Sequence, residues 1–314
     1  MMAVMDQSGF RGELRQNEAL ARYTSWRVGG AAAQFYRPAD IDDLARFLAQ
    51  LPPHEPLLWL GLGSNLLVRD GGFPGTVIYT QGALDGLEQL NGMHVRAEAG
   101  VACAKVARFC ARRDLVGAEF LAGIPGTVGG ALSMNAGAFG GETWSHVVAV
   151  ETVDRRGRLH TRTPADYRIG YRSVEAPAEE WFLAAHLQLQ AGDGEAAQTR
   201  IKELLDRRGR TQPIGRPSCG SVFRNPPGDH AARLIETAGL KGVCIGAACV
   251  SDKHANFIIN TGGASAADIE ALIERVQADV ERLHGVHLEP EVRIVGVSRN
   301  NAEDAGTQRT RRDD

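Results

Sequence analysis

The sequence has few cysteines, no excess of one charge and no long apolar run. Its five cysteines form no CxxC pair, which predicts reduced thiols packed as small hydrophobic side chains and neither a disulfide framework nor a zinc site. A formal net charge of -3 gives no reason to expect a nucleic-acid partner. No apolar stretch approaches the roughly 18–20 residues that span a bilayer.

Signals for export and for metal binding are also missing. Residues 1–16 mix charges of both signs and lack the apolar core of a signal peptide. The close pair His284 and His287 lacks the further ligands that a zinc site needs. We therefore expect a cytoplasmic protein without membrane association or bound metal, present as a monomer or a weak oligomer.

What the chain does have is glycine, 37 residues of it, between short apolar segments of helical or alternating spacing. Alternation predicts strands in a hairpin over 147–163 and over 181–190. A helix is expected from Ser265, where Asp268 completes a capping box, to its end at Gly285. The last hundred residues, with helices expected over 231–238 and from Ser265 and short strands over 257–260 and 292–295, read as an α+β unit.

Two glycine-rich loops are candidate phosphate sites. The first, 61–65, follows a strand, but Leu66 stands at the third glycine position of a dinucleotide fingerprint and the chain returns to a strand. A Rossmann site therefore fits poorly, and a plain tight turn is the alternative. The second loop, 123–137, is rich enough in glycine for backbone N–H groups to approach an anion, with Thr127 at a possible helix start. No lysine follows as in a P-loop, which argues against nucleotide hydrolysis.

Five blocks in order carry a resemblance to a known family. The two loops, GLGSNLLV and GIPGTVGGALSMNAGAFGGE, resemble the FAD domain of the vanillyl-alcohol-oxidase superfamily. Together with GYRS at 170–173, SCGSVFRNP at 218–226 and LEPEVR at 288–293, they resemble the UDP-N-acetylenolpyruvoylglucosamine reductases of bacterial peptidoglycan synthesis. The resemblance covers roughly residues 23–296.

The resemblance implies a domain organisation. An FAD-binding domain over 1–192, made of two α+β subdomains at about 1–90 and 91–192, would precede a smaller α+β substrate-binding domain over 193–297. The polar residues 298–314 are expected to form a disordered tail.

The resemblance also implies FAD as cofactor and NADPH as co-substrate. Neither glycine loop contains the histidine through which some superfamily members attach flavin, so we expect noncovalent FAD. The positions that match the family's FAD contacts are Gly61, Gly63, Ser64, Asn65, Leu66, Gly123, Ile124, Pro125, Gly126, Thr127, Gly129, Gly130, Asn135 and Gly137.

Three residues match the family's catalytic positions. The family passes hydride from NADPH through flavin to C3 of an enolpyruvyl ether, so C2 must be protonated and the adjacent carboxylate must bear extra charge. Ser221 matches the proton donor, although without its block a serine in a glycine turn would be structural. Arg172, otherwise read as a surface arginine, matches the group that grips the carboxylate with two donors. Glu291 matches the catalytic glutamate, where like charge would favour its protonated, hydrogen-bond-donating form.

Further positions are weaker matches. Asn225 and Arg293 match substrate contacts, and Lys241 and Lys253 are hypotheses for the UDP phosphates. Glu289 is the rival of Glu291, since alternate residues of a strand share a face.

One departure from the family's longer form concerns a tyrosine that folds over the substrate. Arg172 and Ser221 are only 49 positions apart with no tyrosine between them, so the chain resembles the shorter form. How the diphosphate is covered stays open. Two alternative functions also stay open: a flavin oxidase of the same superfamily, and a non-catalytic flavin-binding module.

Overall fold

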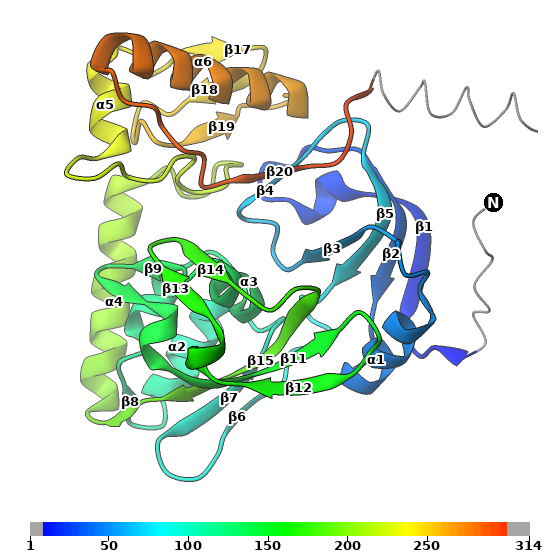
Figure 1. Cartoon of the computed structure of the whole chain (residues 1–314). Helices are drawn as coiled ribbons and strands as arrows, with labels where there is room; N and C mark the ends of the chain where they lie inside the picture. Colours follow the sequence, from blue (N-terminus) through cyan, green and yellow to red (C-terminus); the bar gives the residue numbers. More distant parts are fainter. Residues whose placement is uncertain (1–8, 300–314) are drawn as a thin grey trace, which may run out of the picture. The chain divides into compact units, whose positions relative to one another are not determined.

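A computed structural model describes residues 9–299 of the chain (Figure 1). The chain forms two compact units, each assembled from segments far apart in sequence. Within the described residues, the first unit comprises 9–15, 34–62 and 76–208. The second comprises 16–33, 63–75 and 209–299. The predicted tail lies outside the described residues from position 300 onward.

The first unit is built on an antiparallel five-stranded sheet of order β12-β11-β15-β7-β6. Helix α3 packs on β15, and alternate side chains of the strands enter a core shared with α2 and with the segment Glu119–Gly123. The elements of this unit are β6 (Leu87–Gln89), β7 (His94–Glu98), α2 (Cys103–Ala111), β8 (Leu115–Val116), α3 (Val128–Ser133), β9 (Gly137–Ala138), β10 (Gly141–Glu142), β11 (Val147–Asp154), β12 (Leu159–Arg162), β13 (Arg168–Gly170), β14 (Ser173–Glu175), β15 (Glu180–Gln188), β16 (Gln190–Ala191) and α4 (Gly194–Thr211), of which the last three residues belong to the second unit.

A second sheet has the order β1-β2-β5-β3. Its strands are β1 (Glu13–Ala19), β2 (Ala31–Arg37), β3 (Leu57–Leu60) and β5 (Phe73–Tyr79), and β1, β2 and β5 contribute residues to both units. Helix α1 (Ile41–Gln50) begins at Asp40, whose side chain accepts the N–H of Asp43, and its apolar face is buried through Leu44, Phe47 and Leu48.

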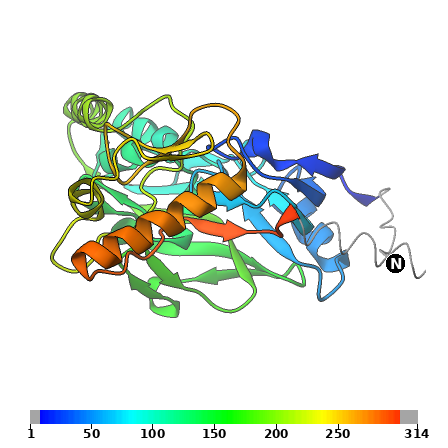
Figure 2. The same cartoon turned by 90° about the horizontal axis from the view of Figure 1, so that it is seen from above.

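The second unit contains a three-stranded sheet, two helices and one parallel strand pair. Its elements are β4 (Leu66–Val68), α5 (Ala231–Thr237), β17 (Cys244–Ile245), β18 (Ala248–Val250), β19 (Ile258–Asn260), α6 (Ala266–His284) and β20 (Arg293–Val295). Helix α6 packs on β17 and β18, and Figure 2 shows it in orange, followed along the chain by β20 in red. The core of this unit also takes in Trp26, whose Nε1–H donates to the carbonyl of Ile258 (2.8 Å).

Several expectations from the sequence are confirmed. Helix α6 has the predicted capping box of Ser265 and Asp268 and ends at Gly285 in the left-handed region. The predicted hairpin is the β11–β12 pair. The helix expected after Thr127 is α3, with Thr127 at its N-cap position.

The prediction for the cysteines is wrong for one pair. Cys244 and Cys249 form a disulfide, whereas Cys103, Cys110 and Cys219 are free and buried. The physical reason is strand register: the two-residue turn Gly246–Ala247 places Cys244 directly opposite Cys249, with 4.1 Å between their Cα atoms. No CxxC spacing signals this arrangement.

The compact units have other boundaries than the domains expected over 1–192 and 193–297, because each unit combines separate segments of the chain. Residues 16–33 and 63–75 pack with the C-terminal hundred residues, because β4 pairs in parallel with β20. Helix α4 also extends the first unit to residue 208.

Candidate functional site

The second glycine loop is tied by its backbone to the segment at the end of β7. The N–H groups of Val128 and Gly129 donate to the carbonyls of Val101 and Ala99, each at 2.9 Å, and Cys103 donates to Gly126 at 2.9 Å. A Cβ on Gly129 would lie 2.9 Å from that of Ala99, so only glycine permits this approach. The loop is therefore rigid and presents its backbone at the start of α3.

The first glycine loop meets the second where Gly61 packs against the side chain of Thr127. A Cβ on Gly61 would lie 2.3 Å from Oγ1 of Thr127, so the two loops of the first unit are in direct contact there. Gly63, in the second unit, has a φ of +60°, and a Cβ would approach the carbonyl of Tyr23 to 2.1 Å. Glycine at positions 61 and 63 thus permits close packing of the loop that a side chain would prevent.

Asn135 ends the second loop, and its side chain holds the loop in place. It is buried and has a φ of +46°. Its Nδ2 donates to the Glu142 carboxylate and to the carbonyl of Gly170, both at 3.1 Å, while its Oδ1 accepts the N–H of Trp144. The amide of Asn135 therefore braces the loop and the β13–β14 hairpin.

Arg172 sits in the turn of that hairpin, where Gly170 pairs with Ser173. Its backbone has a φ of +52°. The guanidinium donates from Nη2 to the carbonyl of Gly137 (2.7 Å) and from Nη1 to that of Asn135 (3.4 Å). The structure therefore brings Arg172 against the second glycine loop.

Ser221 and Glu291 lie on two paired segments of the second unit. Phe223 and Pro290 form an antiparallel bridge. The backbone N–H of Glu291 donates to the carbonyl of Val222 (2.7 Å), and the backbone N–H of Arg224 donates to the carbonyl of Glu289 (2.9 Å). Residues 221 and 291, distant in sequence, are thereby held one residue apart in register. Burial, and to a smaller extent the charge of Glu291, raises the pKa of the neighbouring Cys219 thiol well above its usual value.

The rival carboxylate has a different environment. The Glu289 side chain is 71% exposed and lies 3.7 Å from the guanidinium of Arg224 in an ion pair, whereas Glu291 is half-buried. The two carboxylates therefore differ in exposure, and the choice between them stays a prediction from the sequence motif.

Asn65 links the first glycine loop to the Glu291 segment. Its Nδ2 donates to the carbonyl of Glu291 (3.0 Å), and its own carbonyl accepts the N–H of Arg293 (3.1 Å). The next residue, Leu66, opens β4 opposite Arg293, which is exposed. Asn225 lies at the start of α5, where its Oδ1 accepts the N–H of Ala231.

The two lysines form bonds with residues other than the proposed catalytic ones. Lys241 forms an ion pair with Glu236 (2.6 Å). Lys253 donates from Nζ to the carbonyl of Gly209. A role on the UDP phosphates would require Lys241 to exchange its carboxylate partner for the ligand.

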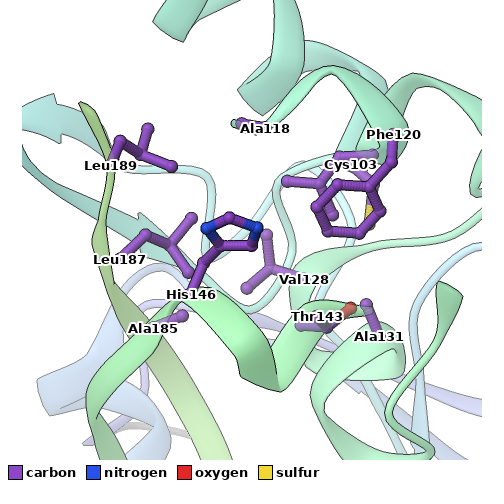
Figure 3. A pocket seen from close by; sticks show the side chains of 11 residues that line it. Cys103, Ala118, Phe120, Val128, Ala131, Thr143, His146, Ala185, Leu187 and Leu189 are labelled. Atoms are coloured by element: carbon purple, nitrogen blue, oxygen red, sulfur yellow. The ribbon is translucent and has the colours of Figure 1, made fainter. Parts of the chain in front are cut away.

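An apolar pocket in the first unit is not a second cofactor site (Figure 3). His146 points into it among Phe120, Val128, Leu187 and Leu189. The lining supplies almost no hydrogen-bond donors for a diphosphate. Within residues 9–299 no group of three or more metal-ligating side chains is present, and no helix is long and apolar enough to cross a membrane.

Sequence reasoning missed one residue that shapes the site. Asn256, buried between β18 and β19, bonds both backbone groups of Phe223, two positions after Ser221. No local pattern signals it, because the partner lies 33 positions away.

Two family models match the chain. One, described as an FAD binding domain, matches residues 32–163, and the other, the C-terminal domain of UDP-N-acetylenolpyruvoylglucosamine reductase, matches 212–295. The UDP-N-acetylenolpyruvoylglucosamine reductase of Alkalilimnicola ehrlichii is 67% identical over 285 residues, which cover 91% of this chain and 95% of that protein. That of Methylococcus capsulatus is 63% identical over 286 residues, covering 91% and 94%.

Comparison with solved structures gives the same family. The reductase of the same name from Thermus caldophilus is 36% identical, with a TM-score of 0.78 over 91% of this chain and 99% of that one. The 6-hydroxy-D-nicotine oxidase of Arthrobacter nicotinovorans has a TM-score of 0.53 over 89% of this chain and 88% of that one, at 12% identity, which shows a shared fold alone. The expected fold class, an FAD-binding domain of oxidase type with a smaller α+β domain, is confirmed. The chain belongs to the UDP-N-acetylenolpyruvoylglucosamine reductase family.

Proposed function

We propose that this protein reduces the enolpyruvyl ether of UDP-N-acetylenolpyruvoylglucosamine to the lactyl ether of UDP-N-acetylmuramate, with FAD as cofactor and NADPH as electron donor. The carrying observation is the pairing of the Ser221 and Glu291 segments, in a chain 67% identical to a reductase of that name. The proposal places the protein in bacterial peptidoglycan synthesis. It includes a cytoplasmic location, where NADPH is supplied, and a monomeric or weakly associated state without a nucleic-acid partner.

The glycine loops are the proposed FAD site. Backbone N–H groups of the loops 61–65 and 123–130 would hold the diphosphate, apart from those of Ile124, Val128 and Gly129, which already donate to carbonyls of the protein. Asn135 and Gly137 would support the site, the first through its brace on the loop and the second through its carbonyl on Arg172. Bound FAD supplies a two-electron relay between NADPH and the enolpyruvyl double bond.

The substrate side of the reaction needs a proton at C2 and compensation for charge on the adjacent carboxylate. We propose that the Ser221 hydroxyl donates the proton to C2 and that Arg172 compensates the charge on the carboxylate. Glu291, in its protonated form, would donate a hydrogen bond to the substrate. Asn225, Arg293, Lys241 and Lys253 are proposed substrate contacts.

The test is anaerobic. NADPH should bleach the flavin absorbance of the purified protein, and the enolpyruvyl substrate should restore it with formation of one lactyl ether per NADPH. An oxidase would instead leave the flavin bleached until oxygen is admitted. A flavin that NADPH never bleaches would indicate a non-catalytic binding module.

A further inference from the structure

Asn256 forms an amide clamp on the segment that carries Ser221. The residue lies in the loop between β18 and β19 and is 3% exposed. Its Oδ1 accepts the N–H of Phe223 (2.9 Å), its Nδ2 donates to the carbonyl of Phe223 (2.8 Å), and its backbone carbonyl accepts the N–H of Val222 (2.9 Å). One residue thus bonds both positions that follow Ser221.

The clamp is presented from a loop that is itself fixed. Ser251 donates its N–H to the carbonyl of Phe257 (2.8 Å), and Phe257 donates to His254 (3.0 Å). The Ser251 hydroxyl accepts the N–H groups of Lys253 and His254. The amide of Asn256 therefore has a defined position before it meets the Ser221 segment.

On its other side, Ser221 follows a turn at Gly220, and Cys219 before that turn is buried in the core of the second unit. Gly220 has a φ of +79°, and a Cβ built there would meet nothing within 4 Å. On the far edge, the carbonyl of Val222 accepts the Glu291 N–H at 2.7 Å. The clamp therefore fixes the end of the Ser221 turn and, through Val222, its register against Glu291.

We propose that Asn256 is a positioning residue that holds the Ser221 hydroxyl in line for proton transfer to the substrate, without touching substrate or flavin. The inference rests on the proposed function. A proton donor acts only at hydrogen-bond distance from the carbon it protonates, and a displacement of about 1 Å can cost about 10²-fold in rate. Loss of the clamp should therefore weaken the step that uses Ser221 and spare the step that does not.

The chain offers a matched control four positions away. Asn260 is also a buried asparagine of the second unit with three side-chain hydrogen bonds, but these go to Trp26, Gly262 and Ala264. Asn256→Ala and Asn260→Ala remove the same atoms from the same core. Only the first removes bonds to the Ser221 segment.

The experiment is stopped-flow flavin absorbance on FAD-loaded full-length protein, with thermal unfolding measured on each variant. Asn256→Ala should leave reduction by NADPH within about twofold of wild type and slow reoxidation by the enolpyruvyl substrate by roughly 10–10²-fold. Asn260→Ala should leave both steps near wild type at a comparable loss of melting temperature. Asn256→Asp keeps the acceptor for the Phe223 N–H, so its rate of reoxidation should lie between those of wild type and Asn256→Ala. It replaces Asn256→Ala if that variant does not fold.

A double variant separates positioning from general damage. In the Ser221→Ala background, the Asn256 substitution should add little to the loss of reoxidation, because its effect acts through the missing hydroxyl. Losses that multiply, or an Asn260→Ala defect equal to that of Asn256→Ala, would overturn the inference. Wild-type flavin that the substrate does not reoxidise would instead refute the proposed function.

Discussion

The conformation of Arg172 is fixed both at its backbone and at its side chain. A φ of +52° is uncommon for a residue other than glycine, and here the two-residue turn of the β13–β14 hairpin and two bonds to the glycine loop hold it. The planar guanidinium can keep these bonds to loop carbonyls and still direct other N–H groups elsewhere. A single ammonium group at the end of a flexible chain cannot do both.

Arg172→Lys should therefore lower kcat by about 10²–10³-fold although the charge is kept, the loss typical of one donor to a developing anion. Arg168→Lys, on the same hairpin but 83% exposed beside Glu175, should remain near wild type in steady-state assays. Near-normal kcat in Arg172→Lys would mean that Arg172 does not hold the carboxylate.

Ser221→Ala should separate the two half-reactions. NADPH delivers hydride without a proton from Ser221, so flavin reduction should survive nearly intact. Reoxidation by the substrate should slow by about 10²–10⁴-fold, the usual contribution of a positioned general acid. Rapid-mixing absorbance measures both steps in one preparation.

A neighbouring serine provides the control. Ser218→Ala changes a hydroxyl of the same loop whose bond, to the carbonyl of Arg216, is long at 3.4 Å. It should leave both steps unchanged. Equal slowing of both steps in Ser221→Ala would give Ser221 a role in shaping the flavin pocket, and no slowing of either would make Glu291 the next candidate for the proton.

At the scale of elements, helices and strands with local sequence signals could be predicted, whereas the pairing of segments distant in sequence could not. Helix α6 followed from its apolar stripe, its capping box and Gly285, all of which act within a few residues of one another. The catalytic segments were found as motifs, but their pairing, and the clamp from Asn256, depend on contacts between residues 33 to 70 positions apart. Nothing in a single sequence records such partners.

The Cys244–Cys249 disulfide joins residues only five positions apart, yet their spacing did not predict it. The residues were predicted as thiols from their spacing, yet the β17–β18 register places them directly opposite each other. Iodoacetamide should label only Cys103, Cys110 and Cys219 in protein denatured without reductant, and all five cysteines after reduction. Labelling of all five without reductant, as read by mass spectrometry, would contradict the disulfide.

Reduction of that disulfide should also affect stability. Closing a loop of about six residues contributes about 2 kcal/mol in the chain-entropy estimate, so reduced protein should unfold at lower denaturant. Cys249→Ala should match the reduced protein and be insensitive to reductant. The strand pair itself should persist, because the Val250 N–H donates to the carbonyl of Val243 independently of the sulfurs.

At the scale of the whole molecule, the sequence order hides how the units are composed. Segments 16–33 and 63–75 lie within the range predicted as FAD-binding, but they pack with the C-terminal residues. Trp26 shows how: its ring is fully buried in that core, and Asn260 donates to its carbonyl at 2.9 Å. The first glycine loop, at the junction 62–63, therefore belongs to both units.

FAD should stabilise the whole protein against unfolding. A ligand held by the folded backbone of the glycine loops binds only the folded chain, so FAD at 100 times its Kd should raise the free energy of unfolding by about 2.7 kcal/mol. Flavin-free protein should melt at a lower temperature and recover on addition of FAD, measured by calorimetry. Because neither loop contains a linking histidine, acid precipitation should release the yellow colour into the supernatant. Flavin that stays with the precipitate would indicate a covalent bond, and a melting temperature insensitive to FAD would mean that the folded chain does not bind FAD.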